Sequence, residues 1–493
     1  MLWSDFLIHS LPGQPGGPLL AQHAGLIPIN ESLNQSLFFW HFDRVEAPQL
    51  NEPDKTLIWL NGGPGCSSLD GALIELGPYR LNSDGTLRPN EGSWNQNLNL
   101  LFLDQPVGTG FSSVGAGILQ TELPEVTTNF MTFILNFAEL NPAFQNTEIW
   151  LGGESFSGQY LPYFADAIIR HNIGNSTFPL RLGGVLAGNA YIDPASHYFA
   201  LLPSAAEQNL LHPSPSAQAR LRRQETLCRI SLDANPHHIS YRDCELIMWG
   251  ILTESQRNGT RGSLECYNQY DTRLYDEWPA CGSNWPPDVS LTKQWLRRTD
   301  VRRALNVPDT VGEWDECRGS VSKAMLLKTS HPSIDFLPSI LAHVPVVLYS
   351  GSADLIVNHI GTEMMIANME WNGEVGWNLD IHSSNIHPHV WLLEDGSPGG
   401  TVQVARNLTY VIVDDASHMV PFDQPLKARD MAYGALGVRN RTLWNLQQEP
   451  KLPSKTGSRY EVEFVPVWLS SSMTLGCIFS GFTLSLMCLS LFL

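Results

Sequence analysis

The feature that most constrains this 493-residue chain is a series of short apolar runs, each ending at a glycine-rich or acidic turn. Such runs of β-branched, aromatic and leucine residues are typical of buried parallel strands. A helical pattern follows one of them, because Leu161, Phe164, Ala165 and Ile168 recur at i, i+3, i+4 and i+7. This alternation predicts an α/β fold, with a mostly parallel central sheet flanked by helices on both faces. The runs are TLIWLNGGPG, LNLLFLDQPVGTG, TEIWLGGES, VPVVLYSGSAD and TYVIVDDASH.

Ser155 lies in the glycine cluster GGESFSG, directly after one of these runs. A serine between a strand and a helix, with small neighbours, is typical of a nucleophile elbow, where a sharp turn exposes the hydroxyl. The usual G-x-S-x-G pattern is incomplete here, since Ser157 replaces the last glycine and Gly158 follows it. An ordinary strand-to-helix turn is the alternative, so the interpretation depends on the partners of Ser155.

A serine nucleophile needs a base, and the base needs an orienting acid. On α/β-hydrolase sheets these follow in the order Ser, Asp, His. Asp354 and His418 each stand just past a later apolar run, at the edge where the carboxyl ends of parallel strands meet. We therefore expect Ser155, Asp354 and His418 to form a catalytic triad.

Acyl transfer also needs hydrogen-bond donors for the developing oxyanion. The backbone N–H of Phe156, the residue after the serine, is one candidate. The N–H of Gly63, in the glycine loop WLNGGPGCSS, is the other. This loop is not a phosphate-binding loop, since no Lys-Ser or Lys-Thr pair follows its glycines.

Six of the eight cysteines precede the C-terminal apolar segment, and none forms a CxxC pair. A zinc ribbon or a redox dithiol is therefore not expected, and the even number suggests three disulfides of open connectivity. Pairing neighbours locally gives Cys228–Cys244 and Cys266–Cys281, which would staple an insertion of about residues 200–315 over one edge of the sheet. Cys66–Cys317 would then tie that insertion to the glycine loop. Buried free thiols are the alternative.

The formal net charge of −19 argues against a nucleic-acid partner, which would require a basic face. It is compatible with attraction of cationic substrates. We expect neither a metal nor a cofactor in the site.

The motifs WLNGGPGCSS, DQPVGTGFS, GESFSG, GSADLIVN and HMVPFDQP, in this order, resemble those of the serine carboxypeptidases, over roughly residues 5–440. The resemblance implies the α/β-hydrolase fold and the triad and oxyanion roles given above. Its cysteine pattern agrees with the three disulfides. The opening SLPGQPGGPLLAQHAG and the apolar C-terminus are most similar to a membrane-bound fungal branch of the family.

The resemblance further implies that Asn61, Glu75 and Glu154 hold the terminal carboxylate of a peptide. Packed and partly buried, the two glutamates should have raised pKa values, so that in acid they donate hydrogen bonds to that carboxylate. The chain departs from the family at Phe156, where tyrosine is usual, and at Ser157, where alanine or glycine is usual. It also has Ser417 where glycine is common. We expect altered substrate contacts but retained chemistry.

The two ends of the chain indicate the secretory pathway. Residues 464–493 carry no charge and are long enough for a membrane span, and the polar residues 446–463 read as a linker to the domain at 1–445. The alternatives are a lipid-anchor signal or a truncated sequence. No signal peptide is evident at the N-terminus, so we expect one to be missing. Six glycosylation sequons support this location, at Asn30, Asn34, Asn175, Asn258, Asn407 and Asn440.

The leading hypothesis is an acid carboxypeptidase that removes single C-terminal residues, preferentially Lys and Arg, from peptides and proproteins. We expect it in the trans-Golgi network membrane, with lipid anchoring at the cell surface as the alternative. Three other functions remain open: an acyltransferase on the same scaffold, a vacuolar or cell-surface carboxypeptidase of broad specificity, and an inactive binding protein.

Overall fold

The computed structural model describes residues 1–16, 20–48, 52–174, 178–259, 262–377 and 388–438, with the backbone of 445–446. Within these residues an 11-stranded sheet has the order β1-β2-β6-β3-β7-β8-β12-β17-β16-β15-β18. The six strands from β6 to β17 are parallel, whereas both margins are antiparallel. Five of the six parallel strands are the apolar runs of the sequence, which confirms the mostly parallel sheet. The strands are β1 (Gln22–Asn30), β2 (Gln35–Phe42), β3 (Lys55–Leu60), β6 (Asn99–Asp104), β7 (Glu148–Glu154), β8 (Leu182–Gly188), β12 (Val346–Gly351), β15 (His389–Leu392), β16 (Pro398–Ala405), β17 (Leu408–Val413) and β18 (Asn445–Leu446).

Helices cover both faces of this sheet because its strands are apolar on both sides. In β3, Ile58 and Leu60 enter one core, while Leu57 and Trp59 enter the core on the other face. The helices of the first core are α1 (Leu123–Leu140), α2 (Ser157–Ile173), α9 (Leu337–Leu341) and α10 (His359–Asn368). Those of the second core are α6 (Asp288–Leu296), α7 (Thr299–Ala304), α11 (Val420–Asp423) and α12 (Pro425–Ala435).

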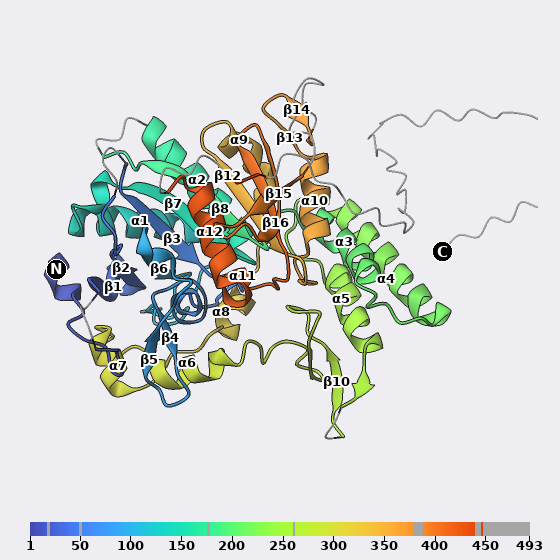
Figure 1. The fold of residues 1–493 in the computed structure, drawn as a ribbon, viewed down its shortest axis with the longest axis horizontal. Helices are drawn as coiled ribbons and strands as arrows, with labels where there is room; N and C mark the ends of the chain where they lie inside the picture. Colours follow the sequence, from blue (N-terminus) through green and yellow to red (C-terminus); the bar gives the residue numbers. More distant parts are fainter. Residues whose placement is uncertain are drawn as a thin grey trace, which may run out of the picture. The chain divides into compact units, whose positions relative to one another are not determined.

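A third core lies in the segment 194–285, which we call the cap. In Figure 1 its helices α3, α4 and α5 lie together, on the side opposite strands β1 and β2. The disulfide Cys228–Cys244 joins α4 to α5, and Cys266–Cys281 closes the segment after them. Helices α6 and α7, which lie within the range predicted for the insertion, pack on the sheet instead. The cap elements are α3 (Pro194–Glu207), α4 (Pro215–Ala234), α5 (Arg242–Glu254), β9 (Arg257–Asn258), β10 (Leu264–Tyr267) and β11 (Tyr275–Glu277).

The third disulfide, Cys66–Cys317, ties the glycine loop after β3 to the segment after α7. All three predicted pairings are therefore present. The remaining short elements are η1 (Trp3–Phe6), η2 (Gly71–Glu75), β4 (Tyr79–Leu81), β5 (Leu87–Pro89), η3 (Trp94–Gln96), η4 (Phe144–Asn146), α8 (Gly319–Ala324), η5 (Ser333–Asp335), β13 (Glu370–Trp371) and β14 (Glu374–Val375).

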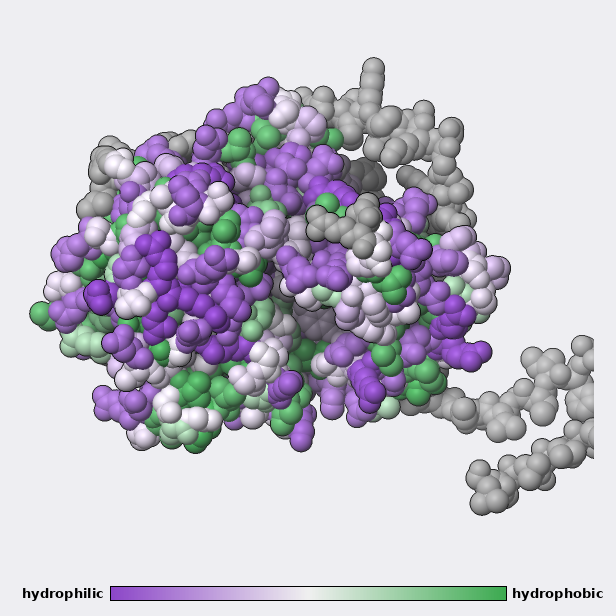
Figure 2. Space-filling view, turned by 90° about the horizontal axis from the view of Figure 1, so that it is seen from below, coloured by the Kyte–Doolittle hydropathy of each residue, from purple (hydrophilic) through white to green (hydrophobic). Residues whose placement is uncertain are grey.

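The predicted membrane segment 464–493 lies outside the described residues, as do residues 447–463 of the linker and the sequon asparagines Asn175 and Asn440. In the part of the chain that the structure describes, no helix is both long and apolar enough to cross a bilayer. Among the other sequons, Asn34, Asn258 and Asn407 are exposed, and Asn30 is half-buried. Figure 2 shows one face that is mainly hydrophilic, with hydrophobic residues in small groups and a hollow near its middle.

Candidate active site

Ser155 occupies the sharp turn between β7 and α2. Its φ of 61° is left-handed, a conformation that few residues other than glycine adopt. Its N–H donates to the carbonyl oxygens of Gly188 and Asn189 at 3.1 and 3.2 Å, and its own carbonyl accepts from the Tyr191 N–H at 2.9 Å. The surroundings therefore hold the strained backbone in place while the side chain stays half-exposed. This geometry favours a nucleophile elbow over an ordinary turn.

Glycines allow the loop after β3 to approach this elbow closely. A Cβ on Gly62 would lie 2.5 Å from the Phe156 amide nitrogen and 2.8 Å from the Ser155 Cβ. The next residue, Gly63, has a φ of +108°, which L side chains rarely adopt. The glycine loop thus lies against the Phe156 amide, the arrangement that a two-donor oxyanion hole requires.

His418 and Asp354 are paired as predicted. His418 Nδ1 lies 2.7 Å from Asp354 Oδ2, and both side chains are buried. Asp354 Oδ1 accepts from the Ile356 N–H at 3.0 Å. A buried carboxylate fixed in this way holds the imidazole in one orientation and stabilises its protonated form.

Asn189, which was not predicted, also orients the acid. It directly follows β8, and its Nδ2 donates to Asp354 Oδ2 at 2.7 Å, while its Oδ1 accepts from the Gly351 N–H at 3.1 Å. The signal in the sequence is the apolar stretch GGVLAGN, another strand that ends at a polar residue. Asn189 therefore links the ends of β8 and β12 beneath the pair.

The cap supplies a wall that rests on both partners of this pair. The His418 N–H donates to the Tyr270 carbonyl oxygen at 2.9 Å, and the Ile356 N–H donates to that of Gln269 at 3.1 Å. Arg273 pairs with Asp423, which in turn accepts from the Ser417 N–H at 2.7 Å. The cap segment and the histidine loop are thus held as one unit.

Ser155 and His418 line a common cavity of about 350 Å³, which we call the smaller cavity. Asn61 and Glu154 line it too, as do Gly63 and the ring of Trp285. A cavity of this volume has room for a single amino-acid residue.

The three residues predicted to hold a terminal carboxylate lie together. Asn61 Nδ2 donates to Glu75 Oε1 at 2.9 Å and to Glu154 Oε1 at 3.1 Å. Asn61 Oδ1 accepts from the Trp59 Nε1–H at 3.0 Å and from the Gly71 N–H at 3.1 Å, which fixes the orientation of the amide. This amide therefore bridges the carboxyl group of Glu154, which lines the smaller cavity, and that of Glu75, which is fully buried and does not line it.

Burial shifts the pKa values of both glutamates upward. Desolvation raises the pKa of Glu154 well above its ordinary value, and the nearby carboxyl of Glu75 raises it further. The pKa of Glu75 is also raised by burial, although the hydrogen bond from Asn61 opposes the shift. At acidic pH the pair is therefore protonated and able to donate hydrogen bonds to a carboxylate.

Two acidic residues of the smaller cavity were missed at the sequence level. Asp70 and Glu316 both line it. Burial raises the pKa of Glu316 to about 7, and burial together with the neighbouring acids raises the pKa of Asp70 well above its ordinary value. The Ser67 N–H donates to the Glu316 carbonyl at 2.7 Å, next to the Cys66–Cys317 disulfide. The disulfide thus brings Glu316 to the cavity from a distant part of the chain.

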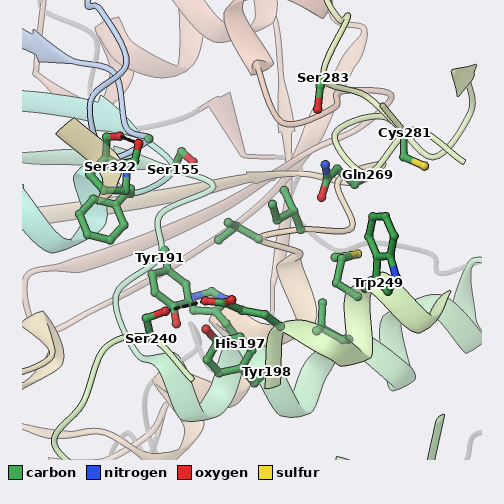
Figure 3. Close-up of a pocket in the computed structure, with 18 of the residues that line it drawn as sticks. Ser155, Tyr191, His197, Tyr198, Ser240, Trp249, Gln269, Cys281, Ser283 and Ser322 are labelled. Atoms are coloured by element: carbon green, nitrogen blue, oxygen red, sulfur yellow. Dashed lines mark hydrogen bonds between the residues drawn. The ribbon is translucent and has the colours of Figure 1, made fainter. Parts of the chain in front are cut away.

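A larger cavity of about 530 Å³ opens on the other side of Ser155, beneath the cap. Figure 3 shows Ser155 and Trp249 on opposite sides of it, with Tyr191, His197 and Tyr198 grouped along one edge. Most of its other lining residues are apolar: Pro64, Phe156, Leu201, Ile239, Met248, Leu252, Pro279, Ala280, Met325, Leu327, Ile356 and Val357. One carboxylate, Glu245, accepts from Ser240 Oγ at 2.5 Å.

The side chains at the three departures from the family motifs are all buried. Phe156 packs edge-on against Tyr160, with ring centroids 5.2 Å apart. The hydroxyls of Ser157 and Ser417 are buried and have no hydrogen-bond partner in the described part of the chain. None of these side chains displaces Ser155 or His418 from the smaller cavity.

No group of metal-ligating side chains in the described ranges includes Ser155, Asp354 or His418. The one group found consists of His237, His331 and Asp335, all exposed.

This parallel sheet, with a strained serine and a buried His–Asp pair at its carboxyl edge, defines an α/β-hydrolase. The sequence model described as serine carboxypeptidase matches residues 12–436. The chain belongs to the serine carboxypeptidase family and is a serine-type carboxypeptidase, which confirms the resemblance seen in its motifs.

Individual relatives give the same result. The pheromone-processing carboxypeptidase KEX1 of Tuber melanosporum is 45% identical over 431 residues, which cover 87% of this chain and 68% of the relative. The corresponding carboxypeptidase of Aspergillus fumigatus is 43% identical, with coverage of 87% and 67%. The crystal structure of a prohormone-processing carboxypeptidase from Saccharomyces cerevisiae superposes with a TM-score of 0.82 at 34% identity, covering 88% of this chain and 96% of that one. The chain spans about two thirds of the length of these curated relatives.

Proposed function

We propose that this protein is an acid carboxypeptidase that releases single C-terminal residues, preferentially Lys and Arg, from peptides and proproteins of the secretory pathway. The observation that carries the proposal is the smaller cavity, in which Ser155 and His418 meet Asn61, Glu154 and two further acids. A cavity with a nucleophile at one wall and carboxylate-binding groups at another suits the last residue of a chain.

In the proposed reaction, the hydroxyl oxygen of Ser155 attacks the scissile carbonyl carbon, and His418 takes the hydroxyl proton. Asp354, held by Asn189, stabilises the resulting imidazolium. The N–H groups of Gly63 and Phe156 stabilise the oxyanion. The free amino acid leaves after accepting the proton from His418, and water then hydrolyses the acyl-enzyme.

Recognition of the terminal carboxylate explains both the acid preference and the removal of one residue at a time. Protonated Glu154 and Glu75 donate to the carboxylate, whereas an internal peptide bond offers no such acceptor. As pH rises through their raised pKa values the glutamates ionise and repel the carboxylate, so affinity falls.

Asp70 and Glu316 support the preference for basic residues. A lysine or arginine side chain in the smaller cavity would meet these two carboxyl groups. Its positive charge would favour their ionised forms and so lower their pKa values on binding. A neutral leaving residue would leave the same groups buried without a partner, which is costly.

The decisive experiment incubates the full chain at about pH 5 with a peptide that ends in Lys-Arg, and follows the products by mass spectrometry. We expect stepwise loss of the two basic residues, abolished in Ser155→Ala. Transfer of the acyl group to an added alcohol without net hydrolysis would instead identify an acyltransferase. Absence of any turnover would identify a binding protein.

A second variant tests carboxylate recognition. Glu154→Gln keeps a hydrogen-bond donor but cannot ionise, so its KM should change less with pH than that of the wild type. If the pH profiles of KM coincide, Glu154 does not hold the carboxylate.

Location and processing belong to the same proposal. The sequons at Asn34, Asn258 and Asn407 stand on exposed positions, as glycosylation in the secretory pathway requires. Residues 464–493 would anchor the catalytic domain on the lumenal side of the trans-Golgi membrane. Digestion with an N-glycosidase and carbonate extraction of membranes from expressing cells test these two points.

A further inference from the structure

His237, His331 and Asp335 converge at the junction between the cap and the sheet domain. Their ligand atoms all lie within 4.8 Å of one another. His331 Nδ1 is 3.2 Å from Asp335 Oδ2, and the two imidazole rings have centroids 5.2 Å apart. His237 belongs to the cap loop between α4 and α5, whereas the other two residues belong to the segment around η5. The group therefore brings together two segments that are far apart in the sequence, and Ile239 of the first segment packs in the same core as Leu337, just after the second.

The loop that carries His237 is held by hydrogen bonds on both sides of this residue. The Tyr241 hydroxyl donates to the Asn235 carbonyl oxygen and accepts from the His238 N–H at 3.1 Å. The Tyr191 hydroxyl donates to the Ile239 carbonyl oxygen at 2.7 Å. The backbone around His237 is thus fixed, while its ring remains exposed.

The segment that carries the other two residues is equally well held. Glu122 accepts from the backbone N–H groups of Lys328, Thr329 and Ser330 at 2.8–3.1 Å. The Tyr163 hydroxyl donates to the His331 carbonyl oxygen at 2.8 Å. Ser333, between the two ligands, donates through its Oγ to the Gly158 carbonyl oxygen at 2.6 Å. Neither ligand loop needs to fold in order to bring its side chain to the others.

We propose that His237, His331 and Asp335 form a Zn²⁺ site that bridges the cap and the sheet domain. Two imidazole nitrogens and one carboxylate oxygen are donors that suit Zn²⁺, whereas Ca²⁺ and Mg²⁺ prefer oxygen ligands. Bonds of about 2.0–2.1 Å in a tetrahedron separate ligand atoms by roughly 3.3 Å. The 3.2 Å between His331 and Asp335 already meets this spacing. A rotation of the exposed His237 ring completes the set, and water fills the fourth position.

The site would act on the larger cavity and not on the reaction itself. Ile239 and Ser240, which line that cavity, follow His237 in the same loop. Bound Zn²⁺ would add a direct link between the His237 side chain and the segment around η5, next to one wall of the cavity. The expected consequence is a change in KM that depends on the residue preceding the scissile bond, with little change in kcat.

The test is titration of the full chain with ZnCl₂ at pH 7, followed by isothermal calorimetry. We expect one saturable site. Mutating a residue that only hydrogen-bonds to a metal ligand typically lowers metal affinity by about 10- to 100-fold. Loss of a ligand itself, in His237→Ala or Asp335→Asn, should therefore weaken Zn²⁺ binding by at least about tenfold. The matched control is His238→Ala, since His238 is the exposed neighbour outside the group.

Because all three side chains are exposed, these variants should fold, and a thermal melt without metal verifies this. Co²⁺ gives a second readout, since a tetrahedral site produces visible absorption that His237→Ala should remove. The proposal is overturned if Zn²⁺ shows no saturable binding, or if His237→Ala binds it as tightly as His238→Ala does. Binding is measured without substrate, so this result is independent of whether the protein is a carboxypeptidase with basic specificity.

Discussion

The two cavities that meet at Ser155 differ in the chemical character of their lining residues. The smaller cavity has acids in its walls, namely Asp70, Glu154 and Glu316, and is formed by loops at the carboxyl edge of the sheet. The larger cavity is lined mainly by apolar side chains of the cap. Under the proposed function, the side that holds the leaving residue would select by charge, whereas the side that holds the rest of the peptide would select by apolar contact.

This difference separates two kinds of specificity. Buried acids reject an uncharged partner because they lose hydration without gaining a counterion, and such rejection is strong. An apolar wall discriminates weakly, by about 1–3 kcal/mol for a change of one methylene group. An enzyme with both would be strict about the residue it removes and tolerant of the sequence before it.

The largest expected effect is on kcat and comes from Asp354, because it orients the histidine next to Ser155, where the two cavities meet. Asp354→Asn should lower kcat by roughly 10⁴-fold for every peptide, whatever its last two residues, because an amide favours the wrong tautomer of the histidine. Steady-state kinetics on a small panel of peptides measures this. If kcat fell only for peptides with a basic C-terminal residue, Asp354 would act in the smaller cavity alone. Ser155 would then not be a point that both cavities share.

The charge selectivity of the smaller cavity should be the next largest effect. Glu316→Gln should lower the ratio of kcat/KM for Arg-ending over Leu-ending peptides by about tenfold, since a charged hydrogen bond contributes about 1.5–3 kcal/mol. In the wild type this ratio should rise between pH 5 and pH 7, because the pKa of Glu316 is about 7 and ionisation favours the cation.

Glu313→Gln is the matched control, because Glu313 is an exposed carboxylate on the same segment and does not line the smaller cavity. An unchanged ratio in Glu316→Gln, or an equal change in Glu313→Gln, would assign the preference for basic residues to another group.

The sequence predicted the parts of this site that are encoded locally. The proposed nucleophile, its two proposed partners and the proposed oxyanion donors all lie at or next to the ends of apolar runs, where a parallel sheet gathers functional residues. Asn189 has the same signal and was missed because its strand, LGGVLAG, is rich in glycine.

The acids of the smaller cavity could not be predicted in this way. Glu316 belongs to no strand, and it lies at the cavity because the Cys66–Cys317 disulfide and the hydrogen bond from the Ser67 N–H to its carbonyl oxygen hold its segment against the glycine loop. Asp70 precedes the π-helix η2 in a segment that reads as an ordinary buried turn. Likewise, α6 and α7 pack on the sheet rather than on the cap, which reflects tertiary contacts of Trp295 and Val301 that no local pattern reveals.

The apolar side of the comparison predicts a smaller effect. Trp249→Ala should raise KM by about tenfold for peptides with a large apolar residue before the scissile bond, since it removes an aromatic contact. The preference for a basic last residue should not change. Leu246→Ala is the control, because Leu246 is exposed on the same helix but does not line the larger cavity. A loss of basic preference in Trp249→Ala would show that the two cavities are not independent.

The smallest expected effect is on folding stability. A buried group of the smaller cavity and one of the larger cavity should change this stability in opposite directions as pH changes. The folded-state pKa of Glu154 is raised, so above its ordinary pKa the folded protein holds more protons than the unfolded chain, and stability falls as pH rises. Burial lowers the pKa of His197, in the larger cavity, to about 4. Between pH 6.5 and 4 the unfolded chain then holds more protons, and stability falls as pH decreases.

The contributions of Glu154 and His197 to the pH dependence of stability can be removed one at a time by substitution. Glu154→Gln should reduce the loss of Tm between pH 5 and 8, and His197→Gln should reduce the loss between pH 6.5 and 4, each by about 1–2 °C. Calorimetric melts of the two variants and the wild type across this range measure both effects. If Glu154→Gln instead left the loss between pH 5 and 8 unchanged, the carboxyl would already be ionised at pH 5 in the folded protein. Ionised Glu154 would then repel the terminal carboxylate of a peptide across this whole pH range, even where the larger cavity binds the rest of the peptide.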